Sequence, residues 1–184
     1  MKMNRVYFDM DGVLVDWFGG ICDLLQRDRF HEESRWPEGA TTEQALQVDV
    51  DRMWNLVSRH GSDWWANLDP LPAMRDLLAL FADSRAEIGI LTSPANCEHA
   101  ATGKIRWLKQ YLPGYVDRVH MTVDKHHLAR RGVLLIDDHD GNCERFRAAG
   151  GTAVLFPQVW NKKRFHCSRQ LESVRAQLRY YKVR

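Results

Sequence analysis

The chain has few cysteines and no paired arrangement of them. Its 184 residues include four cysteines, which are widely separated and form no Cys-x-x-Cys pair. This scatter argues against a disulfide framework and against a zinc knuckle, and it is typical of proteins whose thiols stay reduced. We therefore expect a cytoplasmic protein rather than a secreted one.

Long hydrophobic runs are also missing. Asp9 and Asp11 interrupt the only early apolar stretch, so the N-terminal residues make a poor signal peptide. No uninterrupted apolar stretch approaches the roughly eighteen residues that a membrane-spanning helix needs. We expect no membrane partner.

A strong charge of one sign is absent as well. The formal net charge is +2, which is too small to indicate nucleic-acid binding by bulk electrostatics. The segment 162–184 is locally basic, with Glu172 as its only acid, and we interpret it as a solvated helix face. There is no internal repeat or low-complexity tract. We therefore expect no nucleic-acid partner, and a homodimer is left open.

Strand-like and helix-like segments alternate along most of the chain. Apolar, strand-like runs are expected at 6–8, 87–91, 116–122, 133–136 and 152–156, with amphipathic helices between them at 74–81, 101–112 and 144–149 and a final helix at 168–181. Alternation of this kind implies parallel strands with right-handed crossovers. The sequence therefore predicts an α/β fold, a three-layer sandwich with a parallel, Rossmann-like sheet.

The segment between the first strand and residue 70 differs from the rest. It shows no convincing strand; we expect a helix at 17–29, a loop at 30–42 and one or two helices ending near Gly61. Five of the seven tryptophans lie before residue 70, and the stiff Asp69-Pro70-Leu71-Pro72 connector follows. We predict a helical cap at 17–69, inserted into a core domain made of 1–16 and 70–184.

Polar side chains follow four of the predicted strands. They are Asp9 and Asp11, Thr92 and Ser93, Asp124 and Lys125, and Asp137 and Asp138. Ligands of parallel α/β sheets bind at the carboxyl ends of the strands. We therefore expect these groups to share one edge of the sheet.

Together these groups are suited to phosphate chemistry. Asp9 and one of Asp137 or Asp138 could hold Mg²⁺ through hard oxygen ligands, while Lys125 and Thr92 contact phosphoryl oxygens. Asp9 could attack phosphorus to give an aspartyl phosphate. Asp11 could protonate the leaving oxygen and later activate water.

The same residues resemble a known superfamily. The stretch Asp9-Met10-Asp11-Gly12-Val13, Thr92 after an apolar strand, Lys125, and Asp137-Asp138 after another strand resemble the four motifs of the haloacid dehalogenase phosphohydrolases. Within that superfamily the chain is most similar to the 5'(3')-deoxyribonucleotidases, on Asp-Met-Asp-Gly-Val-Leu-Val-Asp at 9–16, Leu-Asp-Pro-Leu-Pro at 68–72 and Leu-Thr-Ser-Pro at 91–94. The stretches 103–108 and 122–125 extend the similarity.

The resemblance implies a role for each matching residue. Asp9 would be the nucleophile and Asp11 the acid and base. Mg²⁺ would be bound by the Asp9 carboxylate, the Asp11 backbone carbonyl and Asp137, with Asp138 in or next to the ligand shell. Thr92, Ser93 and Lys125 would hold the phosphate, with Lys104 as a competitor that we rank second because it lies in a predicted helix. Aromatic residues of the cap would enclose the nucleobase: Trp17, with Trp36 or Trp64.

The expected activity is hydrolysis of deoxyribonucleoside or ribonucleoside monophosphates, with Mg²⁺ as cofactor and a small nucleotide as the partner molecule. Two alternatives stay open. One is a phosphatase of the same superfamily for another small phosphate ester, such as a sugar phosphate, or for DNA 3'-phosphate ends. The other is a nucleotide-binding or scaffold protein that keeps the fold without the activity.

Overall fold

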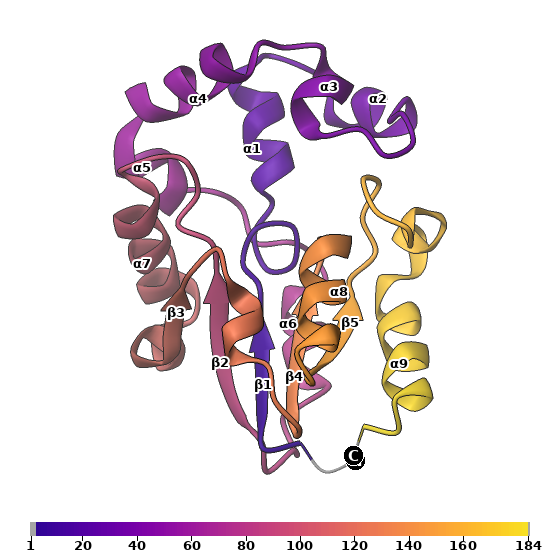
Figure 1. Ribbon diagram of the computed structural model, residues 1–184. Helices are drawn as coiled ribbons and strands as arrows, with labels where there is room; N and C mark the ends of the chain where they lie inside the picture. The colour runs from indigo at the N-terminus through magenta and orange to yellow at the C-terminus, as the bar shows by residue number, and fades with distance from the viewer. Residues whose placement is uncertain (1–2, 184) are drawn as a thin grey trace.

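The computed structural model describes residues 3–183, and its centre is a five-stranded parallel sheet (Figure 1). The strand order is β3-β2-β1-β4-β5, and every neighbouring pair is parallel. The strands are β1 (Arg5–Phe8), β2 (Glu87–Thr92), β3 (Val119–Met121), β4 (Val133–Asp137) and β5 (Thr152–Leu155). The first strand of the chain therefore lies in the middle of the sheet.

Helices cover both faces of this sheet. Side chains alternate along each strand, so neighbouring residues of one strand pack into cores on opposite faces. Val6 and Phe8 of β1 belong to a core that includes residues of α6 (Met74–Ala79) and α9 (Gln170–Tyr180), whereas Tyr7 belongs to a second core with α8 (Asp140–Ala148). The helix α7 (Ala100–Tyr111) follows β2. The predicted α/β fold with a parallel sheet is confirmed.

The segment after β1 is helical and lies beyond the carboxyl ends of the strands (Figure 1). It contains α1 (Trp17–Leu24), α2 (Arg29–Ser34), α3 (Thr42–Leu46), α4 (Val50–Arg59) and α5 (Gly61–Ala66). The prediction of a loop throughout 30–42 was wrong, since α2 occupies its first part. That helix buries none of its side chains, so it has no hydrophobic periodicity to detect; the Asp28 carboxylate caps it by accepting a hydrogen bond from the His31 amide.

The chain leaves and re-enters the sheet region at neighbouring points. The amide of Asp16 donates to the Asp69 carbonyl at 2.8 Å, and the amide of Leu71 donates to the Leu14 carbonyl at 2.8 Å. These bonds fix where the helical segment stands on the sheet. The division into a cap at 17–69 and a two-part core stays a prediction.

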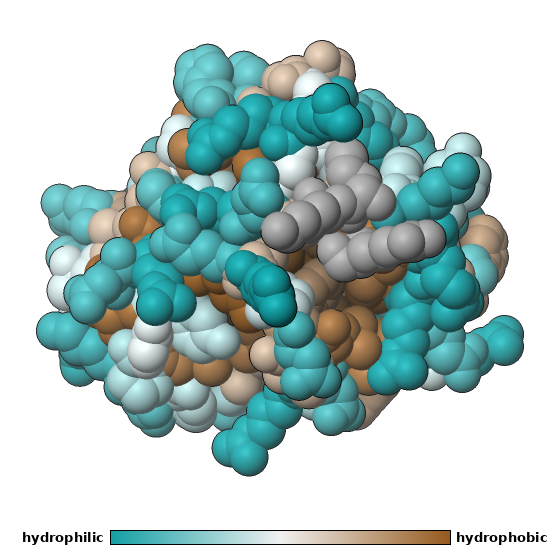
Figure 2. Space-filling model, turned by 90° about the horizontal axis from the view of Figure 1, so that it is seen from below, coloured by the Kyte–Doolittle hydropathy of each residue, from teal (hydrophilic) through white to brown (hydrophobic). Residues whose placement is uncertain are grey.

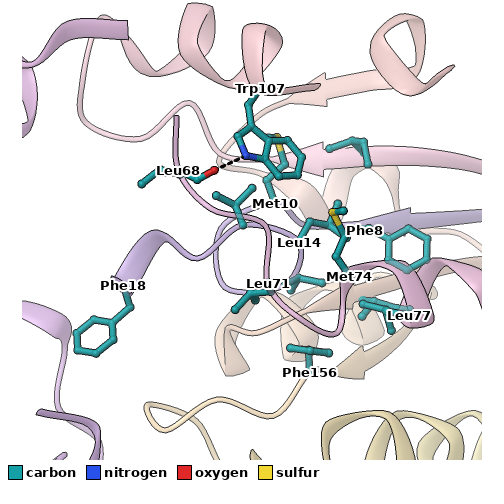
Figure 3. Packing of buried hydrophobic residues seen from close by; sticks show 14 of the residues in the cluster. Phe8, Met10, Leu14, Phe18, Leu68, Leu71, Met74, Leu77, Trp107 and Phe156 are labelled. Atoms are coloured by element: carbon teal, nitrogen blue, oxygen red, sulfur yellow. Dashed lines mark hydrogen bonds between the residues drawn. The ribbon is translucent and has the colours of Figure 1, made fainter. Parts of the chain in front are cut away.

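The helix α7 is tied to the same crossing. In Figure 3 the indole N–H of Trp107 donates to the Leu68 carbonyl, over 2.8 Å, while Leu14, Leu71 and Met74 pack nearby. All of these side chains are buried. A continuous apolar core therefore joins the helical segment to the sheet.

One strand is shorter than the sequence suggested. Residues 116–118, predicted to begin a strand, belong instead to the 3-10 helix η1 (Pro113–Arg118), which Pro113 can begin because its fixed backbone suits a first helical turn. Of two further 3-10 helices, η2 (Lys125–Leu128) follows β3 and η3 (Arg164–Arg169) directly precedes α9. No helix of the described residues is long and apolar enough to cross a membrane.

The amino ends of the strands form the opposite end of the molecule. Figure 2 shows that this end is covered largely by hydrophilic residues, with hydrophobic residues visible between them. The polar groups predicted to carry the chemistry follow the carboxyl ends of the strands instead.

Candidate active site

The loop after β1 is tightly wound and requires glycine at one position. The amide of Asp9 still pairs with the Ile136 carbonyl of β4, after which the amides of Val13, Leu14 and Val15 all donate to the Met10 carbonyl. Gly12 has φ +74°, and a Cβ placed there would lie 2.2 Å from the Oδ2 atom of Asp138. Only glycine lets this loop approach the end of β4 so closely.

Three carboxylates gather where β1 and β4 end. Asp9, Asp137 and Asp138 are all buried, and each offers an oxygen within 4.8 Å of the others. Burial raises the pKa of Asp9 to about 6, against the opposing effect of Lys125, with the neighbouring Asp137 and Asp11 adding to the rise. Burial and the charges of Asp137 and Asp9 raise the pKa of Asp138 well above its ordinary value. The cluster therefore resists full ionisation.

Lys125 supplies one positive charge to this cluster. Its Nζ atom lies 2.6 Å from Oδ2 of Asp9 and 2.7 Å from Oδ2 of Asp137. Burial alone would lower the pKa of Lys125, but the two carboxylates outweigh it and raise the pKa overall. One ammonium group leaves the three carboxylates with an excess of negative charge.

The donor set fits a divalent cation. Hard oxygen ligands from carboxylates are those that Mg²⁺ prefers, and a cation would offset the repulsion that raises the pKa values of Asp9 and Asp138. Asp137 is held in place by the His139 amide at 2.8 Å and by the Asn142 side-chain amide. The side chain of Asp11 lies outside this group of three, and a contact through its backbone carbonyl stays a prediction.

The second acid of the loop has a different set of neighbours. Oδ2 of Asp11 accepts a hydrogen bond from Nζ of Lys104 at 2.6 Å, and Oδ1 is buried without a hydrogen-bond partner among the described residues. The same Nζ donates to Oγ1 of Thr92 at 3.0 Å and to the Ser93 carbonyl at 2.6 Å. Lys104 thus joins the end of β2 to the acidic loop.

Lys104, ranked second to Lys125 as a phosphate contact from the sequence, contacts the acidic loop directly. A lysine in an amphipathic helix is ordinarily solvated, yet Lys104 is only 1% exposed, because α7 packs against α5 and directs this position toward the end of β2. Both lysines therefore reach the acidic site: Lys125 contacts Asp9 and Asp137, and Lys104 contacts Asp11 and Thr92.

A cavity of about 480 Å³ opens over these groups. Asp9, Asp11, Ser93, Lys125 and Asp138 contribute to its wall from the sheet side. The rest of its wall comes from α1, the stretch 39–43, the start of α8 and the C-terminal connection, and includes Trp17, Phe18, Gly39, Ala40, Thr41, Thr42, Glu43, His139, Asn142 and Trp160.

The three tryptophans named from the sequence have different positions. Trp17 lines the cavity, with its ring 6.2 Å from that of Trp54. Trp36 is buried against Phe18 and donates its N–H to the Ala40 carbonyl. Trp64 packs on Trp65 and lines another cavity, so the structure brings only Trp17 of the three to the cavity wall.

Residues after β5 also reach the site, and no sequence motif pointed to them. Trp160 donates its indole N–H to Oδ2 of Asp138 at 2.7 Å, and Gln158 donates to the Gly12 carbonyl at 2.6 Å. Their spacing matches no metal-binding or nucleophile pattern. Only the path of the chain after β5 brings them to this edge.

A parallel α/β sheet with two acids directly after its first strand, hydroxyl groups at the end of the second and paired acids at the end of the fourth defines a hydrolase of the haloacid dehalogenase class. The chain belongs to the family of 5' nucleotidase, deoxy (pyrimidine), cytosolic type C proteins, whose family model matches residues 2–176. It is accordingly a phosphatase of the 5'-nucleotidase kind.

Known proteins agree with this assignment. The chain is 35% identical over 147 residues to the human cytosolic 5'(3')-deoxyribonucleotidase, a match that covers 74% of this chain and 71% of the human one. Solved structures share the fold: a haloacid dehalogenase-like hydrolase of Streptococcus pneumoniae gives a TM-score of 0.60 at 16% identity, over 97% of this chain and 98% of that one. A hydrolase of Bacillus subtilis, solved with bound magnesium, gives a TM-score of 0.56 at 12% identity. That match covers 85% of this chain and 87% of the Bacillus subtilis chain.

Proposed function

We propose that the protein hydrolyses deoxyribonucleoside monophosphates to nucleoside and phosphate, with Mg²⁺ as cofactor and an aspartyl phosphate on Asp9 as intermediate. The observation that carries this proposal is the division of labour within one loop. Asp9 lies in the buried carboxylate cluster beside Lys125, whereas Asp11 lies outside that cluster, bonded to Lys104. Two acids in different surroundings are suited to two roles.

Each residue has a defined part in the reaction. A carboxylate oxygen of Asp9 attacks phosphorus, and the bond to the nucleoside oxygen breaks as Asp11 donates a proton to it. Asp11 then takes a proton from the water that hydrolyses the aspartyl phosphate, which releases phosphate and restores Asp9. Thr92, Ser93, Lys104 and Lys125 contact the phosphoryl oxygens. Asp9, Asp137 and Asp138 would hold Mg²⁺, which would offset negative charge on the phosphoryl group.

The size of the cavity supports a small substrate. Ligand sites for small molecules commonly measure about 300–1,000 Å³, and the cavity of about 480 Å³ falls in that range. Trp17 offers an aromatic wall for a nucleobase. We extend the proposal to a cytosolic location, as in the human relative; a homodimer stays a prediction.

The test compares Asp9→Asn with the wild type and with Asp117→Asn, which changes an exposed aspartate on η1. Phosphate release is measured with a panel of deoxyribonucleoside and ribonucleoside monophosphates, a sugar phosphate and an oligonucleotide with a 3'-phosphate. We expect Asp9→Asn to lower kcat at least about a thousandfold, EDTA to abolish wild-type turnover, and Asp117→Asn to behave as wild type. Full turnover by Asp9→Asn would contradict the proposed aspartyl-phosphate intermediate. Faster phosphate release from the oligonucleotide than from the nucleotides would contradict the proposed deoxyribonucleoside monophosphate substrate.

A further inference from the structure

The connection after β5 binds the acidic site at three points. Gln158 donates to the Gly12 carbonyl at 2.6 Å, Trp160 to Oδ2 of Asp138 at 2.7 Å, and Asn161 to the Asp138 carbonyl at 2.8 Å. Gln158 and Asn161 are buried, and Asn161 also donates to the Phe156 carbonyl at 2.8 Å. A segment of four residues thus holds both the loop after β1 and the end of β4.

The indole of Trp160 is fixed by its surroundings as well as by its hydrogen bond. Its ring centroid lies 5.9 Å from that of Phe18 and 5.5 Å from that of Trp36. The same ring lies against Gly12, where an added Cβ would come within 3.1 Å of its Cζ2 atom. One edge of the ring therefore points at a carboxylate while the side chain forms part of the cavity wall.

The carboxylate that Trp160 contacts has few other constraints. Among the described residues, the indole N–H is the only side-chain or backbone donor bonded to the Asp138 carboxylate, whereas Asp137 has donors from Lys125, His139 and Asn142. Without the indole, the Asp138 carboxylate could rotate about its Cβ–Cγ bond. Outer partners of this kind orient metal ligands.

We propose that Trp160 is a positioning residue for Asp138: its N–H holds one oxygen of that carboxylate, which keeps Asp138 oriented toward Asp9 and Asp137 for binding a divalent cation. The inference deepens the proposed function and rests on its metal site. Because Trp160 also lines the cavity, the orientation of Asp138 is coupled to the wall that a substrate touches.

The test uses Trp160→Phe, which keeps an aromatic ring and removes the donor. Titration calorimetry with MgCl₂ measures cation affinity without substrate, and we expect Trp160→Phe to bind Mg²⁺ about ten- to a hundredfold more weakly than the wild type. In hydrolysis of a deoxyribonucleoside monophosphate, raising the Mg²⁺ concentration should restore kcat to within a few-fold of wild type. General damage to the fold would not be reversed in this way.

Trp36→Phe is the matched control. It removes an indole N–H from the same aromatic cluster, but that donor bonds to the Ala40 carbonyl and not to an acid. We expect its Mg²⁺ affinity to equal that of the wild type. The inference is overturned if Trp160→Phe binds Mg²⁺ as well as the wild type does, or if Trp36→Phe loses as much affinity.

The calorimetric result separates this inference from the proposed function. A wild-type protein that binds Mg²⁺ but hydrolyses no deoxyribonucleoside monophosphate contradicts the proposed substrate, and the comparison of the two variants still decides the role of Trp160. A wild-type protein that binds no Mg²⁺ overturns both proposals.

Discussion

At the scale of single residues, the site places charge where burial opposes it. Asp9 is almost fully buried beside two other carboxylates. A single ammonium group, that of Lys125, offsets the negative charge of the three. Ionising Asp9 in such a place lowers the folding stability, because burial opposes the charge. The cost should be measurable when no cation is present.

We predict that Asp9→Asn stabilises the metal-free protein at pH 7. The pKa of Asp9 is raised from 3.8 to about 6 in the folded protein, so the folded state binds the proton more tightly than the unfolded state. The free energy of unfolding therefore falls as pH rises between these values, and the loss is complete above the folded pKa. Removing the ionisable group should raise stability at pH 7 by about 2–3 kcal/mol.

Urea unfolding in EDTA, repeated from pH 4 to pH 8, measures this effect. The wild type should lose stability across the window from about pH 4 to pH 6, and Asp9→Asn should lack that component. Asp117→Asn should keep the wild-type profile. A metal-free Asp9→Asn protein that is less stable than the wild type at pH 7 contradicts the prediction.

The residues of the site were predictable to the extent that strands end in them. Asp9, Asp11, Thr92, Lys125 and the acid pair at 137–138 all follow apolar runs, and parallel topology brings such ends together. Lys104 lies within α7, and Trp160 lies several residues beyond the apolar end of β5. They reach the site through the packing of α7 and through the connection after β5, which depend on contacts distant in sequence.

At the scale of elements, the site depends on the fit between α5 and α7. Gly103 on α7 lies so close to α5 that an added Cβ would be 2.2 Å from Cβ of Trp65 and 2.6 Å from the Ser62 carbonyl oxygen. The next residue is Lys104, which carries the contacts to Asp11 and Thr92. The spacing of these two helices therefore sets the position of the Lys104 ammonium group.

We predict that Gly103→Ala both destabilises the protein and slows the enzyme. Overpacking should cost about 1–3 kcal/mol, because the backbone of α5 must shift to admit the methyl group. The displaced Lys104 should lower kcat/KM about ten- to a hundredfold. Thermal unfolding and steady-state kinetics on the same preparation measure the two effects.

Gly114→Ala is the control, since among the described residues no atom outside its chain neighbours and its own helix backbone comes within 4 Å of the Cβ it would add. Equal stability of Gly103→Ala and Gly114→Ala would contradict the account of α5 and α7.

Two elements differ from what the sequence predicted. The helix α2 has no apolar face that a sequence pattern could reveal, and Pro113 begins η1 where the start of β3 was expected.

At the scale of the whole molecule, burial should divide the cysteines into two groups that differ in reactivity. Cys22 and Cys143 are fully buried, whereas Cys97 and Cys167 are partly accessible. Burial raises the pKa of Cys22 to about 12 and that of Cys167 to about 11, and it raises the pKa of Cys143 as well. The thiolate is the reactive form.

We predict that iodoacetamide at pH 8 modifies Cys97 first and Cys167 more slowly in the folded protein. Cys22 and Cys143 should react only when the protein unfolds, because each packs within a core. Mass spectrometry of proteolytic peptides, with and without urea, follows the four sites. Modification of Cys22 or Cys143 at the rate of Cys97 without urea would contradict the described packing.

The central place of β1 has a consequence for how the protein is made. Asp9 follows β1 directly, yet its neighbours in the sheet and site come from residues near 90, 137 and 160, and the bond from Gln158 to Gly12 spans 146 positions. A ribosome therefore synthesises the loop after β1 long before the residues that surround it in the folded protein. A nascent chain that does not yet contain Trp160 and Asn161 lacks their hydrogen bonds to Asp138, so the site is complete only after that stretch has been synthesised.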